Sequence, residues 1–293
     1  MRVTDSMISM NANLALQLDK QQMAQAQNQV DTGLKYNSFA DDPLAQSTVM
    51  QTSTQIDALT QYQRNVNDAT ARASTEDGVL QNITDVLTRA TAIATQQGSS
   101  TSNAANRLSA KAEVDNLLAT AVAAGNTQYQ GTYLFGGDNA TTAPLTTAPP
   151  FYSGTPTTGT HTTQIAAGQL FKSNHNATEL LITPGTLQAL QDLSTALGNN
   201  DTTGIGNALT SITNAQNATQ ALVGDLGARE SQLQVTSANI TAVQSSLSSF
   251  KTSLNGIDAA TAATNLVTRQ TAYQTAMLAT SKVLGMTLTD YLK

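Results

Sequence analysis

IGNALTSITNAQNATQALVGDLGARESQLQVTSANITAVQSSLSSFKTSLNGI, residues 205–257, decides the fold of this chain. Mostly apolar or small residues recur there every seven positions in two interleaved sets. The first set is Ile205, Ile212, Thr219, Leu226, Leu233, Ile240, Leu247 and Leu254. The second set is Ala208, Ala215, Leu222, Arg229, Thr236, Val243, Phe250 and Ile257. About seven sustained heptads are typical of a long coiled-coil helix, which at about 1.5 Å per residue would extend about 75 Å.

A matching pattern occupies residues 59–97 in the first half of the chain. Its two sets are Leu59, Val66, Ala73, Leu80, Leu87 and Ala94, and Tyr62, Ala69, Glu76, Ile83, Ala90 and Gln97. Glu76 and Gln97 are the polar members. Two long helices with such seams predict a mainly α fold: an elongated antiparallel helical bundle or coiled coil built from both chain ends.

Prolines divide the chain, because a proline inside a helix costs about 3 kcal/mol or more. Five of them, Pro144, Pro149, Pro150, Pro156 and Pro184, fall in a Gly- and Thr-rich middle, and the sixth is Pro43. Short apolar runs at 132–135, 164–166, 170–172 and 179–182 predict strands there. We therefore expect five segments: an N-terminal assembly helix at 1–40, half of the helical core at 41–138, a small β-rich domain at 139–185, the other half of the core at 186–256, and a C-terminal assembly helix at 257–293.

Helix ends support this division. Asp42 followed by Pro43 predicts an N-cap and a first helical residue, since proline has no amide hydrogen to lose there. Gly98 is expected to end that helix, and a shorter helix is expected over 106–124. Near the other end, Asn255 and Gly256 interrupt the heptads and Asp258 is a candidate cap for a last helix.

The terminal segments carry apolar stripes that have no obvious partner within the chain. Alone they lack the apolar area to offset about 1 to 2 kcal/mol per residue of ordering entropy, so we expect both ends to stay mobile until other subunits contact them. The residues predicted to form this subunit interface are Met7, Met10, Leu14, Leu18, Leu266, Tyr273, Met277, Leu284, Leu288, Tyr291 and Leu292.

Composition argues against several functions. The chain has no cysteine and a formal charge of −6, with no Lys/Arg cluster, which argues against thiol chemistry and a nucleic-acid partner. His161 and His175 are the only histidines; neither has a second imidazole at helical spacing, so we interpret both as ordinary loop residues and expect no metal site. We find no run of about 18 apolar residues, and hence expect no membrane span and no cleaved secretory signal.

No catalytic constellation is evident either. The adjacent Asp41 and Asp42 do not resemble the carboxylate pair of a glycosidase, whose members come from separate chain positions, and helix capping explains them better. There is no phosphate-binding glycine loop and no nucleophile elbow. We expect neither an enzyme nor a cofactor.

Several motifs resemble a known family. They are TGLKYNS at 32–38 with ADDP at 40–43, GNT at 125–127 with GTYLFGG at 131–137, GAR at 227–229 and LTDYL at 288–292. In order and spacing they resemble bacterial flagellins and flagellar hook-associated proteins, and are more similar to the hook-filament junction members than to flagellin itself. YSG at 152–154 and QIAAG at 164–168 also resemble the small domain of that group, although Thr155 stands where an acidic residue is common.

The resemblance implies a structural protein of the bacterial flagellum, extracellular, exported unfolded through the flagellar type III apparatus without cleavage of a signal peptide. It implies a homo-oligomeric ring that forms an adaptor layer between hook and filament. The implied partners are the first hook-associated protein on the hook side, flagellin on the filament side and an export chaperone, with no nucleic acid and no membrane. Two alternatives remain open: a minor flagellin, and a type III translocator or tip protein that acts at membranes.

Overall fold

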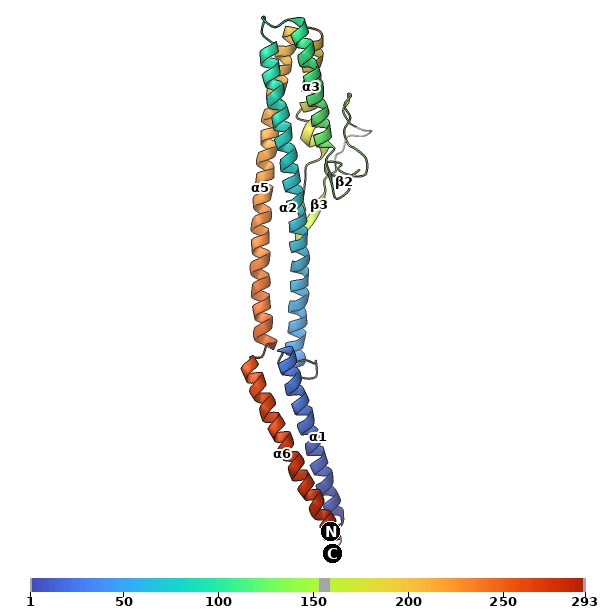
Figure 1. The fold of residues 1–293 in the computed structure, drawn as a ribbon, viewed down its shortest axis with the longest axis vertical. Coiled ribbons are helices and arrows are strands. Elements are labelled where there is room, and N and C mark those ends of the chain that lie inside the picture. Colours follow the sequence, from blue (N-terminus) through green and yellow to red (C-terminus); the bar gives the residue numbers. More distant parts are fainter. Residues whose placement is uncertain (1, 153–158, 292–293) are drawn as a thin grey trace. The chain divides into compact units, whose positions relative to one another are not determined.

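The computed structural model describes residues 2–152 and 159–291, with the side chains of residues 2–6, 8 and 283–291 outside that description. The long helices are α1 (Arg2–Thr32), α2 (Pro43–Gln97), α3 (Ala104–Gly125), α4 (Thr186–Gly198), α5 (Thr202–Asn255) and α6 (Ala259–Tyr291). Between α3 and α4 lie β1 (Gln128–Tyr129), β2 (Thr132–Tyr133), β3 (Thr162–Ala166), β4 (Gln169–Lys172) and a short π-helix, η1 (Thr178–Ile182). The predicted mainly α fold with a small β region is confirmed (Figure 1).

The chain forms two compact units. One combines Met1–Ala58 with Ala242–Lys293, and the other is Leu59–Thr241. Helices α2 and α5 each contribute to both units, because each runs through a unit boundary. In the first unit, α1 lies beside α6 (Figure 1).

The predicted seam is the core of the second unit. Val66, Ala73, Leu80, Leu87 and Ala94 of α2 are all buried. Their counterparts in α5 are buried as well: Ile205, Ile212, Leu226, Leu233 and Ile240. Helices α3 and α4 pack together and complete this core with a set of buried aliphatic residues: Val114, Leu118, Leu187, Leu190, Leu193 and Leu197.

The hairpin of β3 and β4 matches two of the predicted strands and packs on the helical seam. The strands are antiparallel, with an irregularity between Gln164 and Ala166. Ile165 and Phe171 are buried with Val66, Leu233 and the neighbouring seam residues. The hairpin therefore closes one side of the α2 and α5 pair within the second unit.

Two of the strand predictions need correction. Residues 179–182 lie in a π-helix, with Thr183 N donating to Thr178 O at 2.8 Å. Leu180 and Leu181 are both fully buried, and a strand would have turned these consecutive side chains to opposite faces. At 132–135 only Thr132 and Tyr133 pair, with β1, because the chain then turns through Gly136 and Gly137.

Helix ends follow local side-chain chemistry. Asp42 Oδ1 accepts hydrogen bonds from Leu44 N at 3.1 Å and Ala45 N at 3.0 Å, which is N-cap geometry directly before Pro43. Asp258 Oδ2 accepts from Thr261 N at 3.0 Å at the start of α6. Hydrogen bonds from the backbone and hydroxyl of Thr261 hold the pKa of Asp258 below its usual value.

Candidate assembly surface and a buried polar cluster

Helices α1 and α6 pair through small side chains. Ala26 of α1 and Ala262 of α6 are buried, and Leu16, Met23, Leu266 and Tyr273 are half-buried. Arg269 Nη1 donates to Gln22 Oε1 at 2.5 Å across the pair. Small residues allow two helices to approach closely but bury little apolar area, so this pairing leaves the other helix faces uncovered.

The predicted apolar stripe of α1 lies on the uncovered face. Met7, Met10, Leu14 and Leu18 are 49% to 66% exposed. At 100° per residue they lie about 80° to 160° around the helix from the buried Ala26, beside and behind the face that contacts α6. A row of large exposed apolar side chains is typical of a protein interaction surface rather than of a solvated helix.

The predicted residues of α6 whose side chains are described lie on or at the edge of the face that contacts α1. Leu266 and Tyr273 are half-buried and share a helix face with the buried Ala262, so they contribute to the pairing with α1. Met277 is 47% exposed at the edge of that face. For Leu284, Leu288 and Tyr291 the structure gives helical backbone only, and Leu292 lies outside the described residues.

Sequence reasoning missed the apolar residues on the outer face of α6. Val267 and Leu278 are well exposed there, and a shallow groove of about 630 Å³ runs along the helix from Val267 to Ala279. The two residues are eleven positions apart, which is three helical turns. A search for an eleven-residue repeat would have found them, whereas the seven-residue frame passes through Leu266, Tyr273 and Thr280 instead.

The two loops that connect consecutive helices in the first unit are hydrogen-bonded to each other. Lys35 N donates to Asn255 O at 2.7 Å, and Ile257 N donates to Gly33 O at 3.1 Å. Leu34 and Gly256 form an isolated antiparallel bridge. Gly33 has a φ of +68°, a backbone conformation that favours glycine. The link between α1 and α2 is thus hydrogen-bonded to the link between α5 and α6.

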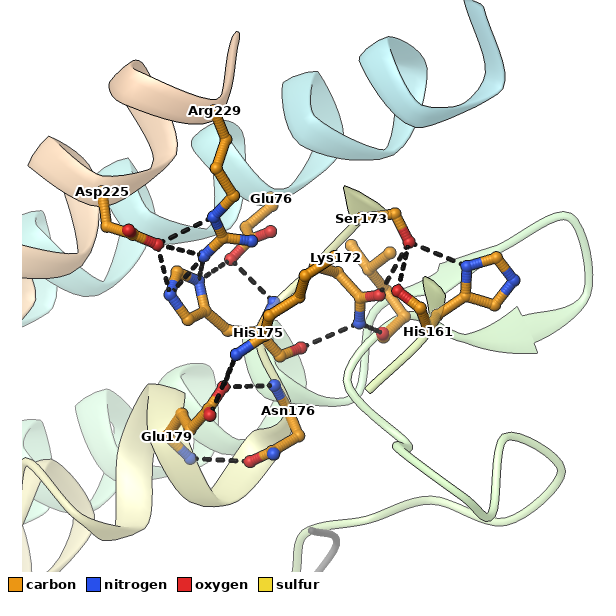
Figure 2. Close-up of polar contacts among 11 residues, drawn as sticks. Glu76, His161, Lys172, Ser173, His175, Asn176, Glu179, Asp225 and Arg229 are labelled. Atoms are coloured by element: carbon orange, nitrogen blue, oxygen red, sulfur yellow. Dashed lines mark hydrogen bonds and ion pairs between the residues drawn. The ribbon is translucent and has the colours of Figure 1, made fainter. Parts of the chain in front are cut away.

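A cluster of charged groups interrupts the seam of the second unit (Figure 2). Glu76 of α2 is completely buried, and its Oε1 forms a short contact with His175 Nδ1. His175 Nε2 lies 3.1 Å from Asp225 Oδ2 of α5. Arg229, one turn further along α5, donates from Nη2 to Asp225 Oδ2 at 2.5 Å. His175 lies in a loop, as the sequence suggests, but it is a buried member of an ion cluster and not an ordinary loop residue.

A second ion pair continues the cluster. Lys172 Nζ lies 2.8 Å from Glu179 Oε2, and Asn176 Oδ1 accepts a hydrogen bond from Glu179 N at 2.8 Å at the start of η1 (Figure 2). Burial raises the pKa of Glu179, but hydrogen bonds from Lys172 and the backbone of Asn176, with nearby positive charge, leave it below its usual value. Burial likewise opposes ionisation of Asp225, whose pKa is nevertheless lowered by Arg229, His175 and Lys172.

The other histidine has a simpler environment. His161 Nδ1 lies 2.8 Å from Ser173 Oγ, and Ser173 Oγ also donates to His161 O at 2.9 Å (Figure 2). Burial, together with the positive charge of Arg72, lowers the pKa of His161. These contacts hold the start of β3 to the end of β4.

Within 2–152 and 159–291, no three His, Asp or Glu side chains gather in a way that would hold a metal ion. The seam position of Glu76 and of Arg229 was visible in the sequence as two charges among apolar residues. Because burial of an unpaired charge is costly, these two positions could have indicated that a charged partner is supplied from elsewhere in the chain, an inference that sequence reasoning did not draw.

The long seam between α2 and α5 and the pairing of α1 with α6 define a mainly helical protein with helices at both ends of the described chain. The bacterial flagellin N-terminal helical region matches residues 3–140, and the bacterial flagellin C-terminal helical region matches residues 209–292. The chain belongs to the bacterial flagellin family.

Curated relatives agree with this assignment over part of their length. Flagellins from Salmonella rubislaw and Salmonella typhimurium are 33% identical to the chain over 128 residues, which is 43% of this chain. The aligned part spans 26% of the length of those flagellins.

Solved structures share the fold over nearly their whole length. A protein from Vibrio parahaemolyticus described as a flagellar hook-associated protein has a TM-score of 0.67 at 19% identity, and the match covers 73% of this chain and 99% of that one. FlgL from Bacillus cereus has a TM-score of 0.61 at 22% identity, covering 69% and 98%. Hook-associated protein 3 from Legionella pneumophila has a TM-score of 0.63 at 14% identity, covering 70% and 98%.

Proposed function

We propose that this chain is a structural protein of the junction between flagellar hook and filament. The observation that supports this most is how much of each similar protein is matched. The structural match includes 98% to 99% of the hook-associated chains, whereas the sequence alignment includes only 26% of the flagellins. The protein acts by assembly and not by catalysis.

The mechanism is association through the terminal helices. The exposed stripe of Met7, Met10, Leu14 and Leu18 gives each subunit an uncovered apolar face, and Val267 and Leu278 give it a second one. Burying such side chains between copies is worth about 1.5 to 3 kcal/mol each when burial is complete. A head-to-tail contact between unlike faces closes into a ring when its rotation permits, and the ring is the assembly that we propose.

The ring would contact different proteins on its two sides. On the hook side the partner is the first hook-associated protein, and on the filament side it is flagellin. Before assembly the exposed terminal helices would be covered by an export chaperone, since apolar helix faces of this kind aggregate when left free. Export in an unfolded state, without cleavage of a leader, belongs to the same proposal.

Deletion of the gene in the native bacterium tests the proposal. A junction protein is required before filament can grow, so the deletion strain should carry hooks without filaments and release unpolymerised flagellin into the medium. A plasmid copy should restore filaments, and a tagged copy should label one narrow joint in electron micrographs. Filaments that still grow on the hooks of the deletion strain would contradict the proposal.

A minor flagellin is the second candidate, because the curated relatives are flagellins and both family regions match. Its tagged copy would label the filament along its length, and its deletion would leave filaments in place.

The translocator alternative makes a different prediction at membranes. No helix in the described part of the chain is long and apolar enough to span a membrane. A translocator would release dye from liposomes, whereas the junction protein should not.

A further inference from the structure

The end of α5 carries the one Asn–Gly pair of the sequence, Asn255 and Gly256. Such a pair is chemically labile, because glycine has no side chain to hinder its backbone nitrogen from attacking the asparagine side chain. In this reaction Gly256 N bonds to Cγ of Asn255, and the side-chain nitrogen leaves as ammonia with the proton of the Gly256 amide. A succinimide ring remains. Water then opens the ring at either carbonyl, which gives aspartate or isoaspartate.

Both residues of the pair are required by their surroundings. A β-carbon added to Gly256 would clash with the carbonyl oxygen of Thr252, so a larger residue would force the backbone to shift. Asn255 is 3% exposed; its Oδ1 accepts from Tyr36 N and its Nδ2 donates to Tyr36 O. Aspartate cannot make both bonds, because an ionised carboxylate has no proton to donate. The structure thus explains why a labile pair occupies this position.

The folded arrangement opposes the reaction at both reacting groups. The attacking atom, Gly256 N, donates a hydrogen bond to Thr252 O at 2.6 Å. The side-chain amide that it would attack is held by its two bonds to Tyr36. The backbone is fixed as well, because Asn255 O accepts from Lys35 N at 2.7 Å. These bonds have to open before Gly256 N can reach Cγ, so the reaction proceeds only from a locally opened state.

Most of this protection comes from the loop between α1 and α2. The bond from Gly256 N to Thr252 O belongs to the last turn of α5, and the last turn of a helix frays readily. The bonds from Tyr36 and Lys35 come from residues about 220 positions away in the chain. The chemical fate of Asn255 therefore depends on whether the two loops of the first unit are paired.

We propose that Asn255 is a deamidation site that the pairing of these two loops protects. In a chain whose loops are unpaired, Gly256 N attacks and Asn255 is converted. The product cannot restore the pairing, because aspartate lacks the Nδ2 donor and would bury a charge beside Tyr36 O. Isoaspartate adds a carbon to the main chain between residues 255 and 256. The modification thus irreversibly marks chains that remain for long without a folded first unit.

The rate of deamidation in folded and unfolded protein is the first test. The full-length chain is incubated in mildly alkaline buffer, with and without guanidinium chloride, and mass spectrometry of peptides measures the converted fraction of Asn255. We expect conversion in guanidinium chloride, and a rate at least about tenfold lower in the folded protein. Equal rates, or no conversion in the unfolded chain, would overturn the proposal.

Lys35→Pro tests whether the loop pairing is what protects. It removes the N–H that donates to Asn255 O and leaves the Asn–Gly pair unchanged. Proline also suits the extended backbone that Leu34 adopts in its bridge to Gly256. Lys35→Ala is the matched control: it loses the same contact with the Tyr36 ring but keeps the N–H. At equal helical content, deamidation should be about threefold or more faster in Lys35→Pro. Equal rates in the two variants would contradict protection by pairing.

Asn255→Asp tests the product independently of these rates. Hydrogen exchange at residues 34–36 should be faster in this variant than in the unmodified protein, because Tyr36 O has lost the Nδ2 donor and a carboxylate is buried beside it. Asn239→Asp, at an exposed position of α5, is the control and should leave exchange there unchanged. Unchanged exchange in Asn255→Asp would show that the deamidated chain still pairs its loops.

Discussion

The side-chain amide of Asn255 hydrogen-bonds both backbone polar groups of Tyr36. Asn255 Oδ1 accepts from Tyr36 N at 2.8 Å, and Asn255 Nδ2 donates to Tyr36 O at 3.1 Å. Asn255 is buried at the end of α5. Its side-chain amide makes the two backbone hydrogen bonds to Tyr36 that a neighbouring strand would otherwise make. This pairing joins the link between α1 and α2 to the end of α5 within the first unit.

Removal of this amide should weaken the first unit. In Asn255→Ala the backbone N–H of Tyr36 loses its partner, while its carbonyl keeps the bond from Gln46 Nε2 at 2.7 Å. A fully buried donor left unsatisfied costs about 1 to 3 kcal/mol, and this half-buried one should cost no more than that. Hydrogen exchange should become faster at residues 34–36 and 255–257. Asn239→Ala, at an exposed position of α5, is the control and should leave exchange there unchanged.

A charge in the seam should destabilise the second unit. Leu233 is 1% exposed and packs with Ile165 and Phe171. Leu233→Asp buries an unpaired carboxylate and should lower the free energy of unfolding by several kcal/mol, and Ile240→Asp should act in the same direction. Val235→Asp, at a residue that is 58% exposed on the same helix, should change stability little. Equal melting temperatures for Leu233→Asp and Val235→Asp would show that the seam is not buried.

Acidification should destabilise the protein through its ion pairs. The pKa values of Glu179 and Asp225 are lowered in the folded chain relative to their ordinary values of 4.5 and 3.8. Such carboxylates stabilise the fold above the unfolded pKa, and the contribution is lost as pH falls through the folded pKa. The free energy of unfolding should therefore decrease below about pH 5. Glu179→Gln should show a shallower decrease in urea unfolding curves, and parallel curves would contradict this assignment.

Truncation separates folding from assembly. Removal of the last 15 or so residues takes away Leu284, Leu288, Tyr291 and Leu292 but no residue of the second unit. The thermal unfolding of the core should therefore be preserved, while motility is lost because subunits no longer associate. Normal motility in the truncated strain would show that the C-terminal stripe is not needed for assembly.

The sequence predicted those parts of the fold that depend on a repeated pattern. The first-set residues from Val66 to Ala94 and most of those from Ile205 to Ile240 are buried as the heptads indicate, because one apolar residue per turn suffices to fix which helix face is covered. Further along α5 the prediction is wrong, since Val243 and Phe250 are 47% and 48% exposed. Asp42 was recognisable as a helix cap because Pro43 follows it. Asn255 was recognisable as a helix break because it interrupts the heptads together with Gly256.

Contacts between distant residues could not be predicted in this way. The strand expected at 179–182 is a π-helix because burial of both Leu180 and Leu181 outweighs their strand propensity. His175 looked ordinary because its partners, Glu76 and Arg229, are 99 and 54 residues away in the chain. Leu266 and Tyr273 face α1 because α1 packs against α6. The sequence pattern of α6 alone does not indicate that contact. The five expected segments and the subunit interface remain predictions.

Solvent access to Leu14 tests the assembly mechanism most directly. The chain has no cysteine, so Leu14→Cys introduces a single reactive thiol on the exposed stripe of α1. Leu170→Cys, on the exposed side of β4, is the control. We predict that a maleimide reagent labels both positions in the monomer, and labels Leu170→Cys but not Leu14→Cys in isolated flagella. Equal labelling of Leu14→Cys before and after assembly would contradict the account.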